Sequence, residues 1–278
     1  MRSVDGMRYV AELAPDGVRP IAGLTEFWAD PRAQLDRWPA RSASVAVAEA
    51  FETIPAVPDS ARVLCVGLNY RDHVAEGTYR DEPYPQAPTI FGRWTASLSV
   101  DGVPAAVPSG EQGLDWEGEV AAYVGRELAD ASADDARAAV LGYSVFNDLT
   151  ARRAQKLTSQ WTVGKNGDAT GVLGPLVTAD EVGDLRDGLD LTTRVNGTQV
   201  QHGNTRDQIY ELGEVLSFLS RAFTLRPGDI VATGTPSGVG YARTPPWFLR
   251  PGDVVTVEVD KLGRISTPIR GEQTGRAS

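Results

Sequence analysis

Two glutamates, Glu117 and Glu119, stand two positions apart within a largely apolar run at residues 114–124. Because alternate side chains of a β-strand point to the same face, a strand here projects both carboxylates together and the intervening apolar side chains to the other face. Carboxylates held side by side repel one another unless a cation lies between them or one is protonated. A third acid, Asp148, stands at the end of another predicted strand. The three acids therefore form a candidate metal site.

An all-oxygen ligand set suits Mg²⁺ or Mn²⁺, which keep several waters and so leave room for a chelating substrate. Zinc would prefer nitrogen or sulfur ligands. The alternative is structural: Glu117 and Glu119 would be the solvated face of an edge strand, and Asp148 would cap the following helix. Spacing alone leaves both interpretations open.

A second group of polar residues follows a predicted strand at 63–68. His73 and Glu76 stand three apart, so one helical turn would place them on the same face, where the carboxylate would orient the imidazole. Such a pair can activate a water molecule, although a weak surface pair is the simpler interpretation in isolation. The polar, proline-rich stretch at 77–85 suits a mobile lid.

Further candidates lie in the second half of the chain. Lys165 is flanked by small residues and could hold an anionic or enolic oxygen, while Arg152 and Gln155 stand three apart at the start of a predicted helix. Residues 233–240, Thr-Gly-Thr-Pro-Ser-Gly-Val-Gly, could offer backbone N–H groups to a carboxylate. The simpler alternatives are an exposed lysine and a solvated helix face.

The composition excludes several classes of protein. With 27 Lys plus Arg against 37 Asp plus Glu, the net charge of −10 disfavours a polyanionic partner, so no nucleic-acid binding is expected. A single cysteine, Cys65, and two histidines can build neither an internal disulfide nor a Cys/His zinc site, which fits a reducing cytoplasm. We find neither a signal peptide nor an apolar run of about 20 residues, so no membrane partner is expected.

The order of predicted elements indicates a small N-terminal domain and a large second one. Residues 1–58 contain two predicted strands (7–13 and 18–21) and a helix (30–38), and they lead into a proline-rich linker at 54–59. Residues 59–270 form the second domain, and residues 271–278 are expected to fray. The second domain is rich in predicted strands, at 63–68, 118–124, 142–149, 191–195, 229–233 and 254–259.

Helices are fewer in the large domain, where the pattern predicts them over 132–141, 150–157 and 207–222. The dipeptide Asn196-Gly197 predicts a type I′ hairpin. Strands and helices do not alternate as in βαβ units, so a doubly wound sheet is disfavoured.

Taken together, these segments resemble the fumarylacetoacetate hydrolase family, in its acylpyruvase and 2-hydroxyhepta-2,4-diene-1,7-dioate isomerase-like branch. The resemblance runs from about residue 62 to residue 269. It rests on Val-Gly-Leu-Asn-Tyr at 66–70 with His73 and Glu76, Asp115-x-Glu117-x-Glu119, Asn-Asp-Leu-Thr-Ala-Arg at 147–152, Trp161 with Lys165 and Asp168, Gly174-Pro175, Val-Asn-Gly at 195–197 with Gln201, and the run at 233–240.

The resemblance implies an α+β fold, a mixed β-sandwich roll with residues 1–58 as a small α/β appendage, and a homodimer. It implies Mg²⁺ or Mn²⁺ bound by the three acids, and His73 with Glu76 as a water-activating dyad on a lid. The residues implied to line the pocket are Arg152, Gln155, Lys165 and Thr235, and Lys165 would stabilise oxyanion charge.

Family members of this kind act on 2-oxo acids, whose carboxylate and C2 oxygen can chelate the metal and so stabilise an enolate. The resemblance favours hydrolysis of the C3–C4 bond of an acylpyruvate-like 2,4-dioxo acid, with release of pyruvate. The alternative is isomerisation, tautomerisation or decarboxylation of a 2-oxo or 2-hydroxydienoic diacid by the same enolate chemistry. A catalytically silent binding protein is less favoured, because it would not need three mutually repelling carboxylates.

The chain departs from the family pattern at residues 91–94, Phe-Gly-Arg-Trp, where relatives commonly carry Phe-x-Lys-Pro. Arg93 thus stands in place of a lysine. Because arginine is always charged and binds carboxylates through two parallel hydrogen bonds, we expect Arg93 to bind a second carboxylate of the substrate.

Overall fold

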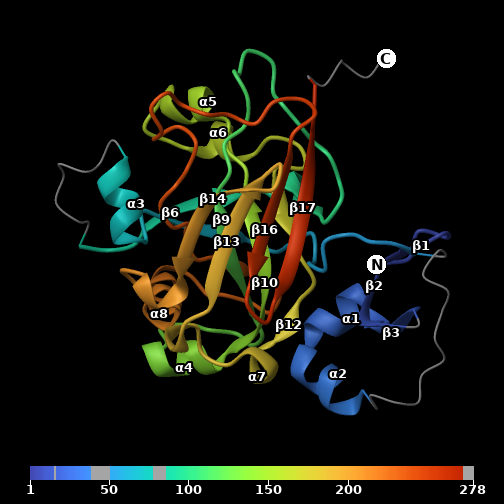
Figure 1. Ribbon diagram of the computed structural model, residues 1–278. Coiled ribbons are helices and arrows are strands. Elements are labelled where there is room, and N and C mark those ends of the chain that lie inside the picture. Colours follow the sequence, from blue (N-terminus) through green and yellow to red (C-terminus); the bar gives the residue numbers. More distant parts are fainter. Residues whose placement is uncertain (16, 39–50, 78–85, 272–278) are drawn as a thin grey trace.

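The computed structural model describes residues 1–15, 17–38, 51–77 and 86–271. Two β-sheets pack face to face at its centre, with helices at both ends and the N-terminal segment at one side (Figure 1). The larger sheet has the order β6 (Thr89–Arg93), β5 (Val63–Gly67), β15 (Ile230–Ala232), β9 (Gly118–Val124), β10 (Val140–Asp148), β11 (Gly171–Leu173) and β7 (Leu98–Val100), with β12 (Val177–Thr178) also paired to β10. The smaller has the order β14 (Thr198–Asn204), β13 (Asp190–Val195), β16 (Val254–Val259), β17 (Gly263–Arg270) and β8 (Ala105–Ala106).

The main core lies between the two sheets. Val120, Ala122 and Val124 of β9 belong to one buried apolar cluster with Leu191 of β13 and Val257 of β16. Each such side chain contributes roughly 1.5–3 kcal/mol by leaving water. The expected alternation along β9 is therefore confirmed, as is the predicted α+β fold with a mixed, two-sheet roll.

Short helices close the ends of the roll. They are α3 (Arg71–Glu76), α4 (Ala133–Ala138), α5 (Arg152–Lys156), α6 (Thr162–Lys165), α7 (Ala179–Val182) and α8 (Leu212–Ala222). Figure 1 shows α5 and α6 at one end, and α4 and α8 at the other. No helix in the described part of the chain is long and apolar enough to cross a bilayer.

The predicted bounds of the helices were too generous. The helix expected over 207–222 begins only at Leu212, because Glu211 and Glu214 form a capping box there and residues 205–207 form a separate 3₁₀ turn. The helix expected over 132–141 ends at Ala138, since β10 starts at Val140, and the one expected over 150–157 is α5.

The hairpin prediction is confirmed. Asn196 and Gly197 have φ values of 49° and 83° and connect β13 to β14, as a type I′ turn requires.

The N-terminal segment covers one outer part of the larger sheet. It contains β1 (Arg2–Ser3), β2 (Tyr9–Ala14), β3 (Gly17–Gly23), α1 (Leu24–Ala29), α2 (Pro31–Arg37) and β4 (Phe51–Glu52). The Trp28 ring stacks on Tyr123 of β9, with centroids 6.1 Å apart and planes inclined by 14°. Leu24 and Phe27 join the same buried cluster, together with Cys65 of β5. We propose that residues 1–58 act as a cover for this face; residues 272–278 lie outside the described range.

Candidate active site

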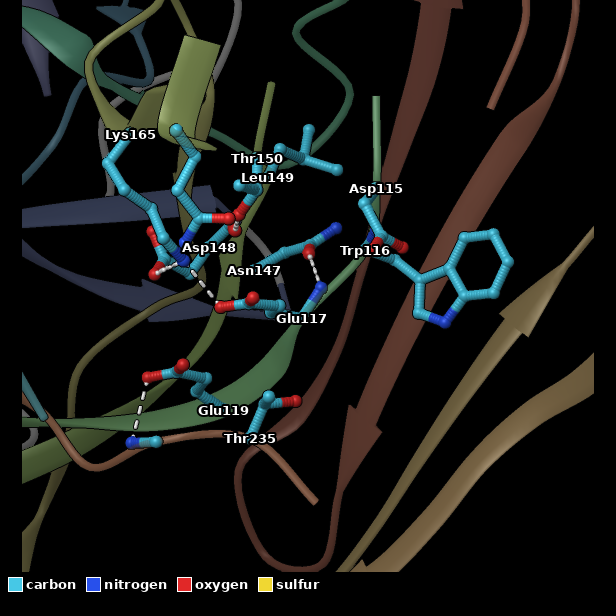
Figure 2. A network of polar contacts seen from close by, with 12 residues as sticks. Asp115, Trp116, Glu117, Glu119, Asn147, Asp148, Leu149, Thr150, Lys165 and Thr235 are labelled. Atoms are coloured by element: carbon cyan, nitrogen blue, oxygen red, sulfur yellow. Dashed lines mark hydrogen bonds and ion pairs between the residues drawn. The ribbon is translucent and has the colours of Figure 1, made fainter. Parts of the chain in front are cut away.

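The three predicted metal acids meet at one end of the larger sheet. Glu117 directly precedes β9, Glu119 lies in it, and Asp148 ends the neighbouring strand β10, where Phe146 pairs with Glu119 (Figure 2). All three side chains are buried, and one oxygen of each carboxylate lies within 4.8 Å of the others. The alternation of β9 thus brings Glu117 and Glu119 to the same face as Ala121 and away from the core between the sheets.

Three cations contact these acids. Lys165 at the end of α6 is buried, and its Nζ lies 2.5 Å from Glu117 Oε2 and 2.6 Å from Asp148 Oδ2. Arg152 Nη2 lies 2.7 Å from Glu117 Oε1, and Arg93 Nε donates to Asp148 Oδ1. Glu117 and Asp148 therefore each contact two cations, and they share Lys165.

The surroundings shift the pKa values of Glu117 and Glu119 in opposite directions. Burial disfavours the charged form of Glu117, but Lys165 and Arg152 outweigh it and lower the pKa of that carboxyl to about 2. Burial raises the pKa of Glu119, and the neighbouring charges of Asp148 and Glu117 raise it further. For Glu119 the structure shows one hydrogen-bond donor, the backbone N–H of Gly234 at 3.0 Å. Glu119 is the least compensated charge in the cluster.

This imbalance fits a divalent cation. The buried acids here are Asp115, Glu117, Glu119 and Asp148, whereas the cations that contact them are Arg93, Arg152 and Lys165. A carboxylate set without nitrogen or sulfur ligands is the donor chemistry that Mg²⁺ and Mn²⁺ prefer. Glu117, Glu119 and Asp148 can therefore hold such an ion, which would supply the positive charge that Glu119 lacks.

His73 and Glu76 lie on one face of α3, as their spacing predicts. His73 Nδ1 and Glu76 Oε1 are 2.8 Å apart, and the other carboxylate oxygen of Glu76 accepts a hydrogen bond of 2.7 Å from the N–H of Gly238. With Glu76 ionised, Nδ1 carries the proton and Nε2 is the basic nitrogen. The lid expected at 77–85 lies outside the described residues, apart from Gly77.

The run at 233–240 is a loop whose amides bind acids, as predicted. Beyond the bonds from Gly234 to Glu119 and from Gly238 to Glu76, Gly240 N–H donates to Asp115 at 2.6 Å. The loop needs glycine at 238, where φ is +105° and a Cβ would lie 2.2 Å from the carbonyl oxygen of Val200.

A cavity of about 220 Å³ opens between these groups. Most of the predicted site residues line it, and Glu76 and Asp148 contact the lining residues His73 and Lys165 from behind. The predicted site residues that line it are His73, Glu117, Glu119, Arg152, Gln155, Lys165 and Thr235. The Thr235 hydroxyl donates to Gly118 O at 2.9 Å and accepts from Gln201 Nε2, so it holds the loop against β9.

The prediction for Arg93 was wrong. Its side chain is fully buried, and it does not line the cavity. Besides Asp148, the guanidinium donates to the carbonyl oxygen of Leu149 and to the hydroxyls of Ser97 and Thr170. Because these partners take up the hydrogen-bond donors of the guanidinium, Arg93 holds Asp148 and does not contact a substrate carboxylate.

Other wall residues were not predicted from the sequence. Tyr241 lies between two cations, with Arg152 Cζ 4.4 Å and Lys156 Nζ 4.2 Å from its ring centroid. Phe91 and Trp161 pack edge to face, 5.4 Å apart, on another part of the wall. No periodic pattern marks these aromatic residues. Asp115, in contrast, shares the alternation of Glu117 and could have been recognised from it.

Several proteins of known structure or activity are similar to this chain. Residues 62–270 match the family model for the C-terminal domain of fumarylacetoacetate (FAA) hydrolase. The mitochondrial oxaloacetate tautomerase fahd2 of Xenopus laevis is 38% identical over 77% of this chain, and the match spans only 66% of that protein.

Two solved structures are similar over most of their length. The 2-hydroxyhepta-2,4-diene-1,7-dioate isomerase of Mycobacterium marinum superposes with a TM-score of 0.72 and 28% identity, covering 99% of this chain and 97% of the isomerase. Fumarylpyruvate hydrolase of Pseudomonas aeruginosa, solved with Mn²⁺ and pyruvate, superposes with a TM-score of 0.69 and 32% identity. The match covers 80% of this chain and 92% of the hydrolase.

Proposed function

The chain belongs to the fumarylacetoacetate hydrolase family, and on that premise we propose that it interconverts the keto and enol forms of a small 2-oxo acid. In this reaction a proton leaves C3 while another is added to the C2 oxygen, so no atom is lost. The observation that carries the proposal is the imidazole of His73, oriented by Glu76 and facing the same cavity as the carboxylate cluster. A tautomerase and an isomerase among the similar proteins support it.

The carboxylate cluster would hold the divalent ion. Glu117, Glu119 and Asp148 are the ligands we propose, and Mg²⁺ or Mn²⁺ would supply Lewis-acid charge at the oxygens of the substrate. Lys165, whose pKa is raised because Asp148 and Glu117 outweigh the effect of burial, stays charged and can bind the enolic oxygen. Arg152 and Gln155, which also line the cavity, would bind the substrate.

The dyad would move the proton. With Nδ1 hydrogen-bonded to Glu76, the Nε2 atom of His73 is free to accept the C3 proton and to return it. The cavity, at about 220 Å³, suits a short acid, because pockets for drug-sized ligands are larger, typically about 300–1,000 Å³. Oxaloacetate, the substrate named for the frog relative, is a substrate of this class.

Hydrolysis of an acylpyruvate-like acid is the second candidate. The same Nε2 atom could deprotonate a water molecule that attacks the distal carbonyl, and the C3–C4 bond would then break to release pyruvate. A similar hydrolase structure favours this alternative. We further propose, from the family resemblance, that the protein acts as a homodimer in the cytoplasm, which light scattering and fractionation can test.

One assay separates these reactions. Enol absorbance would be followed for oxaloacetate, acetylpyruvate, fumarylpyruvate and a hydroxydienedioate, with Mg²⁺ or with chelator, while released pyruvate is measured in parallel. Loss of the enol band without pyruvate indicates a tautomerase. Stoichiometric pyruvate from an acylpyruvate indicates hydrolysis, and pyruvate from oxaloacetate indicates decarboxylation. Metal-independent turnover, or none with any substrate, would overturn the proposal.

A matched pair of variants tests the dyad. His73→Gln should lower kcat at least about a hundredfold, as expected for loss of a general base, while the affinity for Mg²⁺ stays unchanged. His202→Gln is the control, because His202 is the other histidine of the chain and lies exposed on β14. Equal effects of the two substitutions would contradict the proposed role.

A further inference from the structure

Asp115 has no part in the mechanism proposed above, although its carboxylate is among the most completely bonded groups in the protein. Its side chain is fully buried beside the cluster. One oxygen accepts from its own neighbour, Trp116 N–H, at 2.9 Å and from Gly240 N–H at 2.6 Å. The other accepts from Arg152 Nε at 2.7 Å and from Tyr241 N–H at 3.0 Å.

The two partners of that second oxygen form a continuous part of the cavity wall. Arg152 lies over the ring of Tyr241, approaches Glu117, and donates from Nη1 to Gln155 Oε1 at 3.0 Å. The last bond fixes the Gln155 amide, whose nitrogen has no partner within the described part of the chain. The carboxylate of Asp115 is thus connected, through Arg152, to two further residues of the wall.

The backbone around Asp115 leaves little room for adjustment. A Cβ at Gly240 would lie 2.0 Å from the carbonyl oxygen of Trp247 and 2.7 Å from Asp115 Oδ1. A lost bond at Asp115 therefore cannot be replaced by a closer approach of the loop. The segment before β9, helix α5 and the loop at 234–241 meet at this one carboxylate.

We propose that Asp115 is a positioning residue, which holds Arg152 and Tyr241 in the arrangement that binds substrate. The inference rests on the proposed function only in taking this wall to contact the substrate. An interaction misplaced by about 1 Å can cost up to a hundredfold in a reaction that depends on alignment. Arg152 contacts one proposed metal ligand, Glu117, which Lys165 also contacts, and the other two, Glu119 and Asp148, are positioned by β9 and β10.

The chain contains a matched control for a purely structural role. Asp229 is also buried; it accepts from Arg62 Nη2 at 2.6 Å, and from the backbone N–H groups of Arg62 and Arg226 at 2.8 Å. It does not line the cavity. The two acids therefore share their bonding and burial and differ in whether they contact the wall.

The experiment measures binding and turnover in Asp115→Asn and Asp229→Asn. Asparagine leaves one oxygen and turns an NH₂ group toward two of the four donors of Asp115, or toward one or two of the three donors of Asp229, so both variants lose bonds of the same kind. Calorimetry would give the affinity for Mg²⁺ alone and for oxalate in the presence of Mg²⁺, beside KM and kcat for the best substrate of the panel. We expect Asp115→Asn to weaken oxalate binding and raise KM by about 10- to 100-fold, with Mg²⁺ affinity changed less than about threefold.

A double substitution tests whether Asp115 acts through Arg152. In an Arg152→Met background, Asp115→Asn should change oxalate affinity less than about twofold, because the charged one of the two groups that Asp115 positions is gone. Independent, additive effects would overturn the proposal. So would equal losses of oxalate affinity in Asp115→Asn and Asp229→Asn, or a wild-type protein that binds no oxalate.

A second variant serves if Asp115→Asn does not fold. Arg152→Lys keeps the positive charge but lacks the Nε–H that Asp115 holds, so oxalate binding should weaken about tenfold although the charge is retained. Unchanged binding would show that charge alone matters and would overturn the positioning role. Because oxalate binding needs no turnover, failure of the whole substrate panel would overturn the proposed function and leave this test intact.

Discussion

Two halves of one sheet face differ completely in chemistry. On β9, Glu117 and Glu119 are followed on the same face by Ala121 and Tyr123, and on β10 Asp148 shares its face with Phe146. The apolar half, which comprises Ala121, Tyr123 and Phe146, packs under the aromatic residues of α1. The charged half, which comprises Glu117, Glu119 and Asp148, lies at the cavity. The alternation of the strands is the same in both halves. What differs is the cover, so the N-terminal segment decides which part of the face remains available to a ligand.

The comparison predicts that the charged half can be disabled without loss of fold. Glu119→Gln removes one of the three proposed metal ligands, so we expect kcat/KM to fall at least about a hundredfold and the Mg²⁺-induced rise in Tm to disappear. Without metal, the variant should be no less stable than the wild type, because burial and the neighbouring charges of Asp148 and Glu117 disfavour the charged form of Glu119 more than Lys165 favours it. Thermal melts with Mg²⁺ and with chelator measure both effects.

The control for this substitution is Glu258→Gln, a glutamate on the exposed side of β16. It should leave the metal response unchanged. A Glu119→Gln protein that still gains stability from Mg²⁺ would show that the ion binds elsewhere.

The apolar half should show the opposite behaviour. Trp28→Ala removes the ring stacked on Tyr123, and we expect unfolding in urea to become easier by about 3–5 kcal/mol. The affinity for Mg²⁺ in the folded protein should stay within about threefold of the wild type, since the ligands lie at the other end of β9. Trp94→Ala, at an exposed tryptophan, is the matched control. A parallel loss of metal affinity in Trp28→Ala would contradict the independence of the two halves.

Cys65 of β5 lies in the apolar half, close to its border. Cys65→Ser buries a hydroxyl in place of the thiol and should cost about 1–3 kcal/mol in urea unfolding. Burial also raises the pKa of the thiol, so a thiol reagent should label Cys65 only after unfolding. Because the folded pKa lies above the unfolded one, stability is lost as the pH rises through the thiol's ordinary range.

Cys65→Val is the control for that pH dependence. It keeps an apolar side chain of similar size and cannot ionise, so the corresponding loss of stability at alkaline pH should vanish. Rapid labelling of the native wild type would show that this part of the cover opens.

The smallest effect is expected at the border itself. Gly67 follows Cys65 on the same face of β5, and a Cβ there would lie 2.4 Å from the ring of Trp161. Gly67→Ala should displace that ring, with a change in KM of about two- to fivefold and a loss of stability below about 1 kcal/mol. Gly23→Ala is the control, because a Cβ at that position meets nothing within 4 Å. An unchanged KM would mean that Trp161 does not contact the substrate.

The sequence predicted the charged half better than its cover. Local alternation is enough to put Glu117 and Glu119 together, and helical spacing is enough to pair His73 with Glu76. The hydrogen-bond partners of Arg93 lie at 97, 148, 149 and 170. No local sequence pattern could therefore reveal that its guanidinium donors already have partners within the protein. The stacking of Trp28 on Tyr123 likewise joins residues far apart in sequence, which depends on tertiary packing.

The loop at 234–241 has a consequence for protein engineering. Its amides are spaced so that Gly234, Gly238 and Gly240 each meet a different carboxylate: Glu119 of β9, Glu76 of α3 and Asp115 of the segment before β9. Deleting or inserting one residue in the loop would move several of these N–H donors away from their carboxylate acceptors at once. A chimera with a relative should therefore exchange the loop together with residues 71–77 and 114–119 as one unit, and the length of that loop should tolerate little change.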